Sequence, residues 1–174
     1  MIPDLEKSHE LAQRCLGTTE TLQRLGWGVS GFVYLSADKQ SAVKVHLREE
    51  AFEREVYVYK RLKTLRLTEL YGLKIPKYWK SWPLSRTIQM DFITPPYLLD
   101  FAGVLLDPPD FSEDAMDDWH RRVEKMFGRN TDIVWAVYNA LKRYDLYYID
   151  FRPSNLNTTG LQGAEPSGST DDDF

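Results

Sequence analysis

A glycine-rich segment near the N-terminus constrains the fold of this chain more than any other feature. Residues 26–33 read G-W-G-V-S-G-F-V, so Gly26, Gly28 and Gly31 form a G-x-G-x-x-G pattern. Glycines allow a backbone to approach phosphate oxygens without a Cβ in the way. The pattern alone is ambiguous, because it also opens the helix of a dinucleotide-binding unit.

The residues after Gly31 favour a β-hairpin over a helix. Residues 32–35 and 41–45 are rich in branched and aromatic side chains, and the polar residues 36–40 between them are typical of a turn. A dinucleotide site needs a helix that starts at Gly31 and presents its amides to a pyrophosphate. No helical period begins there, so the dinucleotide reading is set aside.

The rest of the N-terminal half predicts a sheet with one long helix. Residues 48–65 place apolar side chains at spacings of three and four, as an amphipathic helix does, and Glu55 borders that apolar stripe. Residues 73–79 and 87–93 are strand-like, with a polar turn between them at 81–86. A short helix over 4–16 precedes the first strand.

The second half changes to helical patterns. Ser112 is expected to cap a helix that ends before Gly128, with acidic residues in its first turns and basic residues near its end. A second helix is expected over 131–144. Residues 158–174 are rich in Gly, Ser, Thr and acid, which predicts a flexible tail.

Length and composition indicate an intracellular, cytoplasmic protein. With 174 residues and 43% hydrophobic content, the chain can bury one core or two small lobes that share an interface. The net charge of -4 and the lack of a long basic run predict no nucleic-acid partner. No membrane segment is expected, and one cysteine excludes an internal disulfide.

The order of motifs resembles the protein kinase-like superfamily. The glycine-rich segment is followed by A-x-K at Ala42 to Lys44, a helix glutamate at Glu55, and D-x-x-x-x-N at Asp150 to Asn155. The resemblance covers residues 22–157. It implies an α+β, two-lobed kinase-like fold with an N-terminal antiparallel sheet plus one helix and a reduced, mainly helical C-terminal lobe. The implied division is 1–93 for the nucleotide-binding lobe, 94–157 for the helical lobe with the catalytic loop, and 158–174 for the tail.

The resemblance also implies a nucleotide site in the first lobe, with ATP as cofactor. Lys44 would pair with the α- and β-phosphates beneath the glycines, and Glu55 would hold the lysine ammonium in place. Residues 90–93 resemble the segment that joins the lobes and contacts adenine. The other residues implied to contact nucleotide are Val33, Ala42, Met90 and Phe92.

The catalytic groups and the metal ligand are implied in the second lobe. Asp150 would accept a hydrogen bond from the acceptor hydroxyl, and Arg152 would lie near the transferring phosphoryl group. Asn155 would bind Mg²⁺ through its amide oxygen. The resemblance thus implies an ATP-dependent phosphotransferase with an unidentified acceptor or partner protein.

Each motif also has a purely structural interpretation. The glycines can be ordinary turn residues, and Lys44 can be a solvated strand lysine. Glu55 can be a surface partner of Lys60 or Arg48, and Asp150 can cap a turn with its side chain. The combination of motifs in this order favours the kinase-like interpretation.

Three departures from the family pattern limit this prediction. Tyr148 and Ile149 replace His-Arg ahead of Asp150, so the usual bracing of the catalytic loop is expected to be missing. The step from Lys44 to Glu55 is short, which makes Glu53 a rival partner for the lysine.

The third departure is the most serious. No D-F-G follows Asn155, and Asp173 in the terminal Asp-Phe is a weak substitute, so a magnesium site is expected to be one ligand short.

Three functions remain open on the sequence. The first is a minimal ATP-dependent phosphotransferase. The second is a non-catalytic, pseudokinase-like module that binds nucleotide or a partner protein. The third is a truncated product that another chain completes.

Overall fold

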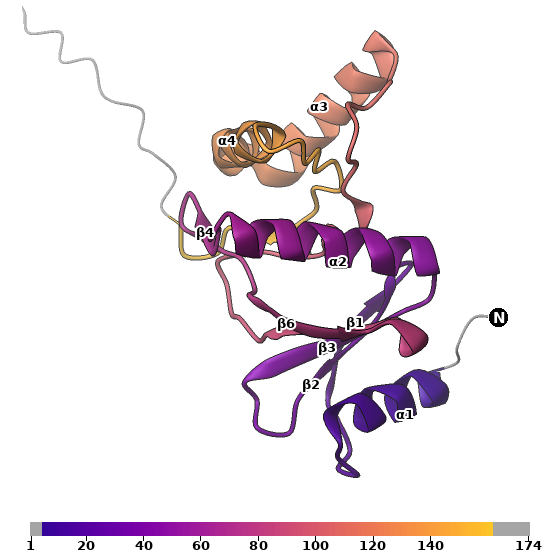
Figure 1. The fold of residues 1–174 in the computed structure, drawn as a ribbon. Coiled ribbons are helices and arrows are strands. Elements are labelled where there is room, and N and C mark those ends of the chain that lie inside the picture. The colour runs from indigo at the N-terminus through magenta and orange to yellow at the C-terminus, as the bar shows by residue number, and fades with distance from the viewer. Residues whose placement is uncertain (1–4, 162–174) are drawn as a thin grey trace, which may run out of the picture.

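A computed structural model describes residues 5–161 of the chain, arranged as an antiparallel sheet half and a helical half. Helix α2 crosses one face of the sheet, α1 covers the opposite face, and α3 and α4 lie beyond α2 (Figure 1). The helices are α1 (Leu5–Leu16), α2 (Glu49–Thr64), α3 (Glu113–Phe127) and α4 (Thr131–Lys142), with short 3₁₀ turns η1 (Pro83–Ser85), η2 (Phe101–Gly103) and η3 (Gly128–Asn130). The strands are β1 (Arg24–Gly28), β2 (Gly31–Leu35), β3 (Ser41–His46), β4 (Glu69–Leu70), β5 (Leu73–Lys74), β6 (Tyr78–Trp82), β7 (Thr87–Asp91), β8 (Tyr97–Leu98) and β9 (Leu156–Asn157).

The main sheet has the strand order β1-β2-β3-β7-β6, with every neighbouring pair antiparallel. The predicted hairpin is confirmed, because β2 pairs with β3 from Gly31 opposite His46 to Leu35 opposite Ala42. The predicted strand over 73–79 is wrong. The chain forms β5 in one sheet and β6 in another, and β6 extends through Trp82, so the following turn begins only at Pro83.

The central strand β3 is buried on both faces, and its alternation places Lys44 against α2. Val43 and Val45 pack with α1 residues such as Ala12 in a small core. Ala42 belongs to the larger core on the other side. Because successive side chains of a strand point to opposite faces, Lys44 and His46 share the α2 side with Ala42. Two polar side chains are thus carried into the interior.

Helix α2 turns its apolar face to the sheet and the helical half. Its buried positions are Phe52, Glu55, Val58, Tyr59 and Leu62. Glu55 therefore lies within the buried stripe and not at its border as the sequence predicted. A buried carboxylate needs a partner, because desolvating an unpaired charge is costly.

Helix α3 begins and ends as the sequence predicts, whereas α4 ends at Lys142, two residues earlier than predicted. Ser112 caps α3 by accepting a hydrogen bond from the Ala115 amide, and Gly128 ends the helix. Helix α4 starts at Thr131. None of the helices between residues 5 and 161 is long and apolar enough to cross a membrane.

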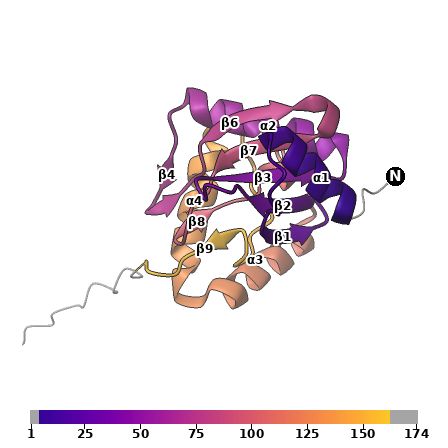
Figure 2. The same ribbon diagram turned by 90° about the horizontal axis from the view of Figure 1, so that it is seen from below.

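A second, four-stranded sheet joins distant parts of the chain in the order β4-β5-β8-β9. Its strands come from both sides of residue 93, and β8 and β9 lie side by side (Figure 2). The division of the chain at residues 93 and 94 stays a prediction. The expected tail begins at 158, and its residues 162–174 lie outside the described part.

Gly28 and Gly31 of the glycine pattern differ in what surrounds them. A Cβ added to Gly31, whose φ is +152°, would lie 2.1 Å from the Val45 carbonyl oxygen. A Cβ on Gly28 would have no atom within 4 Å. Gly31 is therefore required by the close approach of β3, whereas no described atom of the protein would clash with a side chain at Gly28.

We predict that Gly31→Ala lowers the free energy of unfolding by about 3 kcal/mol, because strained φ and a backbone clash combine. The matched change Gly28→Ala is expected to stay within about 0.5 kcal/mol of wild type. Urea unfolding of both variants measures the difference. Equal stabilities would contradict the close approach of β3 at Gly31.

Candidate functional site

Lys44 is the centre of a buried charge cluster between β3 and α2. Its ammonium Nζ lies 2.8 Å from Oε2 of Glu55 and 2.7 Å from Oδ1 of Asp100. Lys44 is 4% exposed and Glu55 is 1% exposed, so the pair is desolvated. The alternatives of a solvated Lys44 and of Glu55 as a surface partner for Lys60 or Arg48 are wrong in this structure.

The electrostatics of the cluster favour the charged forms. Burial raises the pKa of the Glu55 carboxyl, but the charge of Lys44 and the hydrogen bond from His46 outweigh it and lower this pKa to about 2. Burial lowers the pKa of Lys44, and the nearby Glu55 and Asp100 carboxylates reverse that effect and raise it. The exposed Glu53 is not the partner of the lysine.

Asp100 is the site residue that the sequence reasoning missed. It follows β8 and opens the run Asp100-Phe101-Ala102-Gly103, whose backbone forms η2. Asp100 has a left-handed φ of 57°, and its side chain accepts a hydrogen bond from the Ala102 amide. The Phe101 amide donates to Oε1 of Glu55 at 3.3 Å. The signal was an Asp-Phe-x-Gly after an apolar strand, and it stands before Asp150, not after Asn155 where the family pattern places it.

The tip of the glycine-rich segment also reaches Asp100. Ser30, between Gly28 and Gly31, donates from Oγ to Oδ2 of Asp100 at 3.2 Å. The Asp100 side chain keeps 29% exposure. The glycine loop, Lys44 and Asp100 therefore converge on one place on the α2 side of the sheet.

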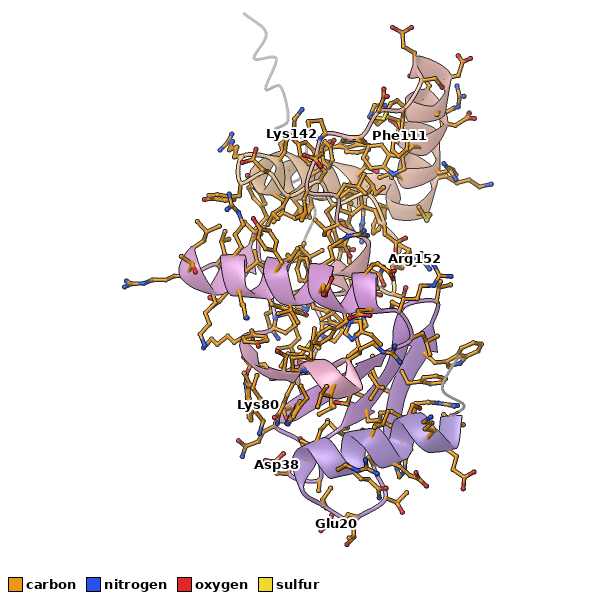
Figure 3. All side chains as sticks on the ribbon, turned by 45° about the vertical axis from the view of Figure 1, so that its right-hand side comes forward. Glu20, Asp38, Lys80, Phe111, Lys142 and Arg152 are labelled. Carbon is orange, nitrogen blue, oxygen red and sulfur yellow. The ribbon has the colours of Figure 1, made fainter. Side chains whose placement is uncertain are left out.

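The predicted catalytic loop forms a compact turn that leads into β9. Arg152 donates from Nε to Oδ1 of Asp150 at 2.9 Å, and its Nη2 contacts the same oxygen. Asn155 donates from Nδ2 to Oδ2 of Asp150 at 3.0 Å and to the Asp150 carbonyl oxygen at 3.1 Å. The three predicted residues are thus brought together. Figure 3 shows Arg152 at the border between the sheet half and the helical half.

Residues 98–103 connect the Lys44 cluster to this loop. The Leu99 amide donates to the Asn155 carbonyl oxygen at 2.6 Å. A Cβ built on Gly103 would lie 3.6 Å from the Asp150 Cβ. The segment that carries Asp100 therefore touches the loop over Asp150 to Asn155 on its other side.

The usual His-Arg is absent ahead of Asp150, and Tyr148 braces the loop over Asp150 to Asn155 through other contacts. Tyr148 is fully buried, and its hydroxyl donates to the Leu99 carbonyl oxygen at 2.5 Å. Its ring meets Phe101 edge to face, with 5.7 Å between the ring centroids. Burial raises the pKa of Tyr148 well above its ordinary value, which keeps the hydroxyl a donor. Tyr148 thus packs the loop onto η2.

The other residues predicted to contact nucleotide line the same sheet. Val33 lies opposite Lys44 in the β2-β3 pairing. Ala42 lies opposite Met90 between β3 and β7, and the Tyr59 hydroxyl donates to the Met90 sulfur at 3.1 Å. Phe92 follows β7 directly, and its amide donates to the Gln40 carbonyl oxygen. Their contact with nucleotide stays a prediction.

The metal prediction is tested only in the described part of the chain. Within residues 5–161, no group of three or more His, Cys, Asp or Glu side chains is arranged to hold a metal ion. Asp173, the weak candidate of the sequence, lies outside those residues. Asn155 is 7% exposed, and the bonds of its Nδ2 to Asp150 orient its amide oxygen.

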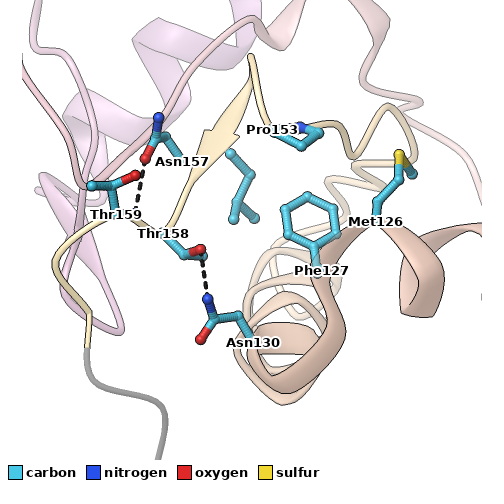
Figure 4. Close-up of a pocket in the computed structure, with 8 residues that line it drawn as sticks. Met126, Phe127, Asn130, Pro153, Asn157, Thr158 and Thr159 are labelled. Carbon is cyan, nitrogen blue, oxygen red and sulfur yellow. Dashed lines mark hydrogen bonds between the residues drawn. The ribbon is translucent and has the colours of Figure 1, made fainter.

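A small pocket lies between the end of α3 and residues 153–159 (Figure 4). At its rim, Nδ2 of Asn130 donates to the Thr158 hydroxyl oxygen at 2.8 Å. Its lining residues are Met126, Phe127, Asn130, Pro153, Leu156, Asn157, Thr158 and Thr159. None of these is a predicted site residue, so we do not assign the site to this pocket.

Comparison with known proteins gives partial structural similarity to solved structures. No family model matches the chain, and no curated protein matches it. Among solved structures, the streptomycin–ATP–APH(2")-IIa ternary complex matches with 18% identity and a TM-score of 0.38, over 75% of this chain and 37% of that chain. That protein is an aminoglycoside phosphotransferase of the protein kinase-like superfamily. The likeness is one of partial fold. The chain spans little more than a third of that protein's length, and residue roles rest on the contacts described above.

We predict that Glu55 makes the folded chain sensitive to acid. Its pKa is about 2 when folded and 4.5 ordinarily. The unfolded chain therefore binds more protons than the folded chain as the pH falls below about 4.5. The contribution of Glu55 to the free energy of unfolding is present above pH 4.5, and roughly 3 kcal/mol of it is lost as the pH falls toward 2.

Urea unfolding at pH 7 and pH 3 measures this loss. Glu55→Gln lacks the titrating group, so its stability is expected to be lower at pH 7 by about 3 kcal/mol and to depend less on pH. The exposed Glu53→Gln on the same helix is the control and keeps the wild-type dependence. A wild-type dependence in Glu55→Gln would contradict the assignment.

Proposed function

We propose that the chain is an ATP-dependent phosphotransferase that acts on a hydroxyl group. The observation that carries this proposal is the convergence of the glycine loop, Lys44 and Asp100 at one place, with residues 98–103 linking that place to Asp150. Phosphoryl transfer requires mainly positioning and charge neutralisation, which such a set of groups can supply.

The nucleotide phosphates would lie between the glycine loop and Lys44. Gly28 leaves open space above its backbone, as a close approach of phosphate oxygens requires. Lys44 is held by Glu55, so its ammonium would be presented to the phosphates without losing its counterion. In the ligand-free chain Asp100 takes the place of a phosphate as the second anion on Lys44.

Asp100 and Asn155 fit the needs of a magnesium ion. Mg²⁺ prefers oxygen ligands and is held by one or two protein groups together with phosphate oxygens and water. The partly exposed Asp100 carboxylate and the Asn155 amide oxygen are such ligands, and they lie on segments joined by the Leu99–Asn155 hydrogen bond. Bound magnesium would neutralise phosphate charge. Asp100 thereby supplies the carboxylate that the sequence pattern lacks after Asn155.

Asp150 is the group best placed to act on the acceptor. It is 36% exposed, and Asn155 and Arg152 orient its two oxygens. It would accept the hydrogen bond of an acceptor hydroxyl, and Arg152 would turn its charge toward the transferring phosphoryl group. The acceptor class is open, with protein, sugar, aminoglycoside-like and lipid-like hydroxyls all compatible.

The alternative is a non-catalytic module that binds nucleotide or a partner protein. One observation favours it. Both carboxylate oxygens of Asp150 already accept hydrogen bonds within the loop, so an acceptor hydroxyl must share or displace a bond to Arg152. A third possibility, completion by another chain, would place the acceptor surface on that chain.

We predict that wild type shows an ATP-dependent rise in melting temperature and measurable ATP turnover. Asp150→Asn keeps the thermal shift but lowers turnover by about 10³-fold, since a general base contributes about 10²–10⁴. Asp145→Asn, at an exposed aspartate just before the loop, serves as control. Equal turnover in wild type and Asp150→Asn favours the non-catalytic module, and no thermal shift in wild type rejects nucleotide binding.

We also predict that Asp100→Asn removes the magnesium-dependent part of the ATP thermal shift. Binding of ATP without magnesium is expected to persist, because the variant keeps Lys44 and loses a nearby negative charge. Titrations with ATP alone and with ATP plus Mg²⁺ separate the two effects, with the exposed Asp107→Asn as control. If Mg²⁺ increases the ATP thermal shift of Asp100→Asn as much as that of wild type, the cation is bound by other ligands.

A further inference from the structure

His46 ends β3 two residues after Lys44, on the same face of the strand. Its side chain is fully buried. Ring atom Nε2 lies 2.5 Å from Oε2 of Glu55, and Nδ1 lies 3.1 Å from the carbonyl oxygen of Arg86. Both ring nitrogens therefore face oxygen atoms that can only accept hydrogen bonds, provided that Glu55 is ionised.

The partners of the ring determine its protonation. A neutral imidazole has one N–H and one lone pair, so one of the two oxygens would face a lone pair in a buried place. Glu55 does not carry the missing proton, because Lys44 lies 2.8 Å from the same carboxylate oxygen and holds the acid ionised. The imidazolium form donates to Glu55 and to Arg86 at once.

Glu55 is consequently shared by two cations. Its Oε2 is in contact with both Lys44 Nζ and His46 Nε2. Its other oxygen accepts from the Phe101 amide, next to Asp100. With Asp100 as the second anion on Lys44, the four side chains balance two positive charges against two negative ones.

We propose that His46 is a positively charged positioning residue that shares Glu55 with Lys44 and makes nucleotide affinity depend on pH. The proposal rests on the proposed function, since it assumes that Lys44 binds nucleotide phosphates. While His46 is charged, Glu55 is partly neutralised and Lys44 can turn toward phosphate. When His46 loses its proton, Lys44 is left as the sole cation on Glu55, and a positive charge near the phosphates is lost. Both effects weaken ATP binding as the pH rises.

The surroundings of His46 contain few other charged groups. Helix α2 contributes Glu55, β3 contributes Lys44, and the segment before β7 contributes Arg86, whose carbonyl oxygen also accepts from the His46 amide at 2.9 Å. Phe52 covers the ring edge to face, with 5.6 Å between centroids. The charge of His46 is therefore coupled mainly to the Lys44–Glu55 pair.

The charge of His46 can be measured without nucleotide. The chain has three histidines, and His46→Gln identifies the His46 signals in a ¹⁵N spectrum of histidine-labelled protein. We expect both ring nitrogens of His46 to be protonated at pH 7. A neutral ring at this pH would overturn the proposal whatever the outcome of the ATP experiments.

The effect on binding is measured as the ratio of ATP dissociation constants for His46→Gln and wild type between pH 6 and pH 9. Titration of ATP itself cancels in this ratio. We expect His46→Gln to bind about tenfold more weakly at pH 6 and equally at pH 9, because only wild type changes charge. His9→Gln and His120→Gln serve as controls, since His9 is partly buried and His120 is exposed. The ATP dissociation constant of each control is expected to equal that of wild type at every pH.

A ratio that is the same at every pH would overturn the proposal, because a purely structural role of His46 acts equally at pH 6 and pH 9. His46→Phe fills the space but donates no hydrogen bond. The ratio of its ATP dissociation constant to that of wild type is expected to change with pH in the same way as the ratio for His46→Gln. If wild type binds no ATP at any pH, the proposed function and the tuning of affinity both fail, while the ¹⁵N spectrum still decides whether Glu55 has a second cation.

Discussion

The burial of Lys44 is the constraint on which the other site contacts depend. An ammonium group beneath α2 is stable there only with anions beside it, because removing one partner of a buried ion pair costs about 3–5 kcal/mol. The chain provides Glu55 from the helix and Asp100 from the turn after β8. Meeting this electrostatic need ties α2 to β3 and to residues 98–103. Groups from three separate parts of the chain are thereby drawn to one place.

The helices and most of the main strands could be predicted from the sequence because they depend on patterns of neighbouring side chains. Alternation in 41–46 and the spacing of three and four in 49–64 place Lys44 and Glu55 correctly on facing surfaces. The break at Pro76 was not predicted, because strand propensity runs through it while the two ends join different sheets. Tyr148 was undervalued because its bond to Leu99 depends on a contact between residues 49 positions apart. Asp100 was missed because motif order was treated as fixed, although a folded chain can bring a carboxylate to a site from either direction.

The candidate site differs from the family pattern that the sequence resembles in the order of its residues along the chain. The family order puts a carboxylate after the D-x-x-x-x-N motif, whereas Asp100 precedes Asp150 by 50 positions and contacts Lys44 directly. The histidine at the end of β3 adds a cation behind Glu55. Residues 5–161 thus bring Lys44, His46, Glu55 and Asp100 together in one charge cluster. The surfaces that choose an acceptor are a separate matter, since only two longer helices follow the site-forming segment in the described chain.

The small sheet β4-β5-β8-β9 has a consequence for how the protein is made. Its last strand, residues 156–157, pairs with residues 97–98 and closes the loop that holds Asp150. During synthesis the main sheet and α2 can form first, whereas the second half of the site must wait until the end of the described chain has left the ribosome. A growing chain would thus acquire its lysine–glutamate pair well before the loop that carries Asp150 is closed.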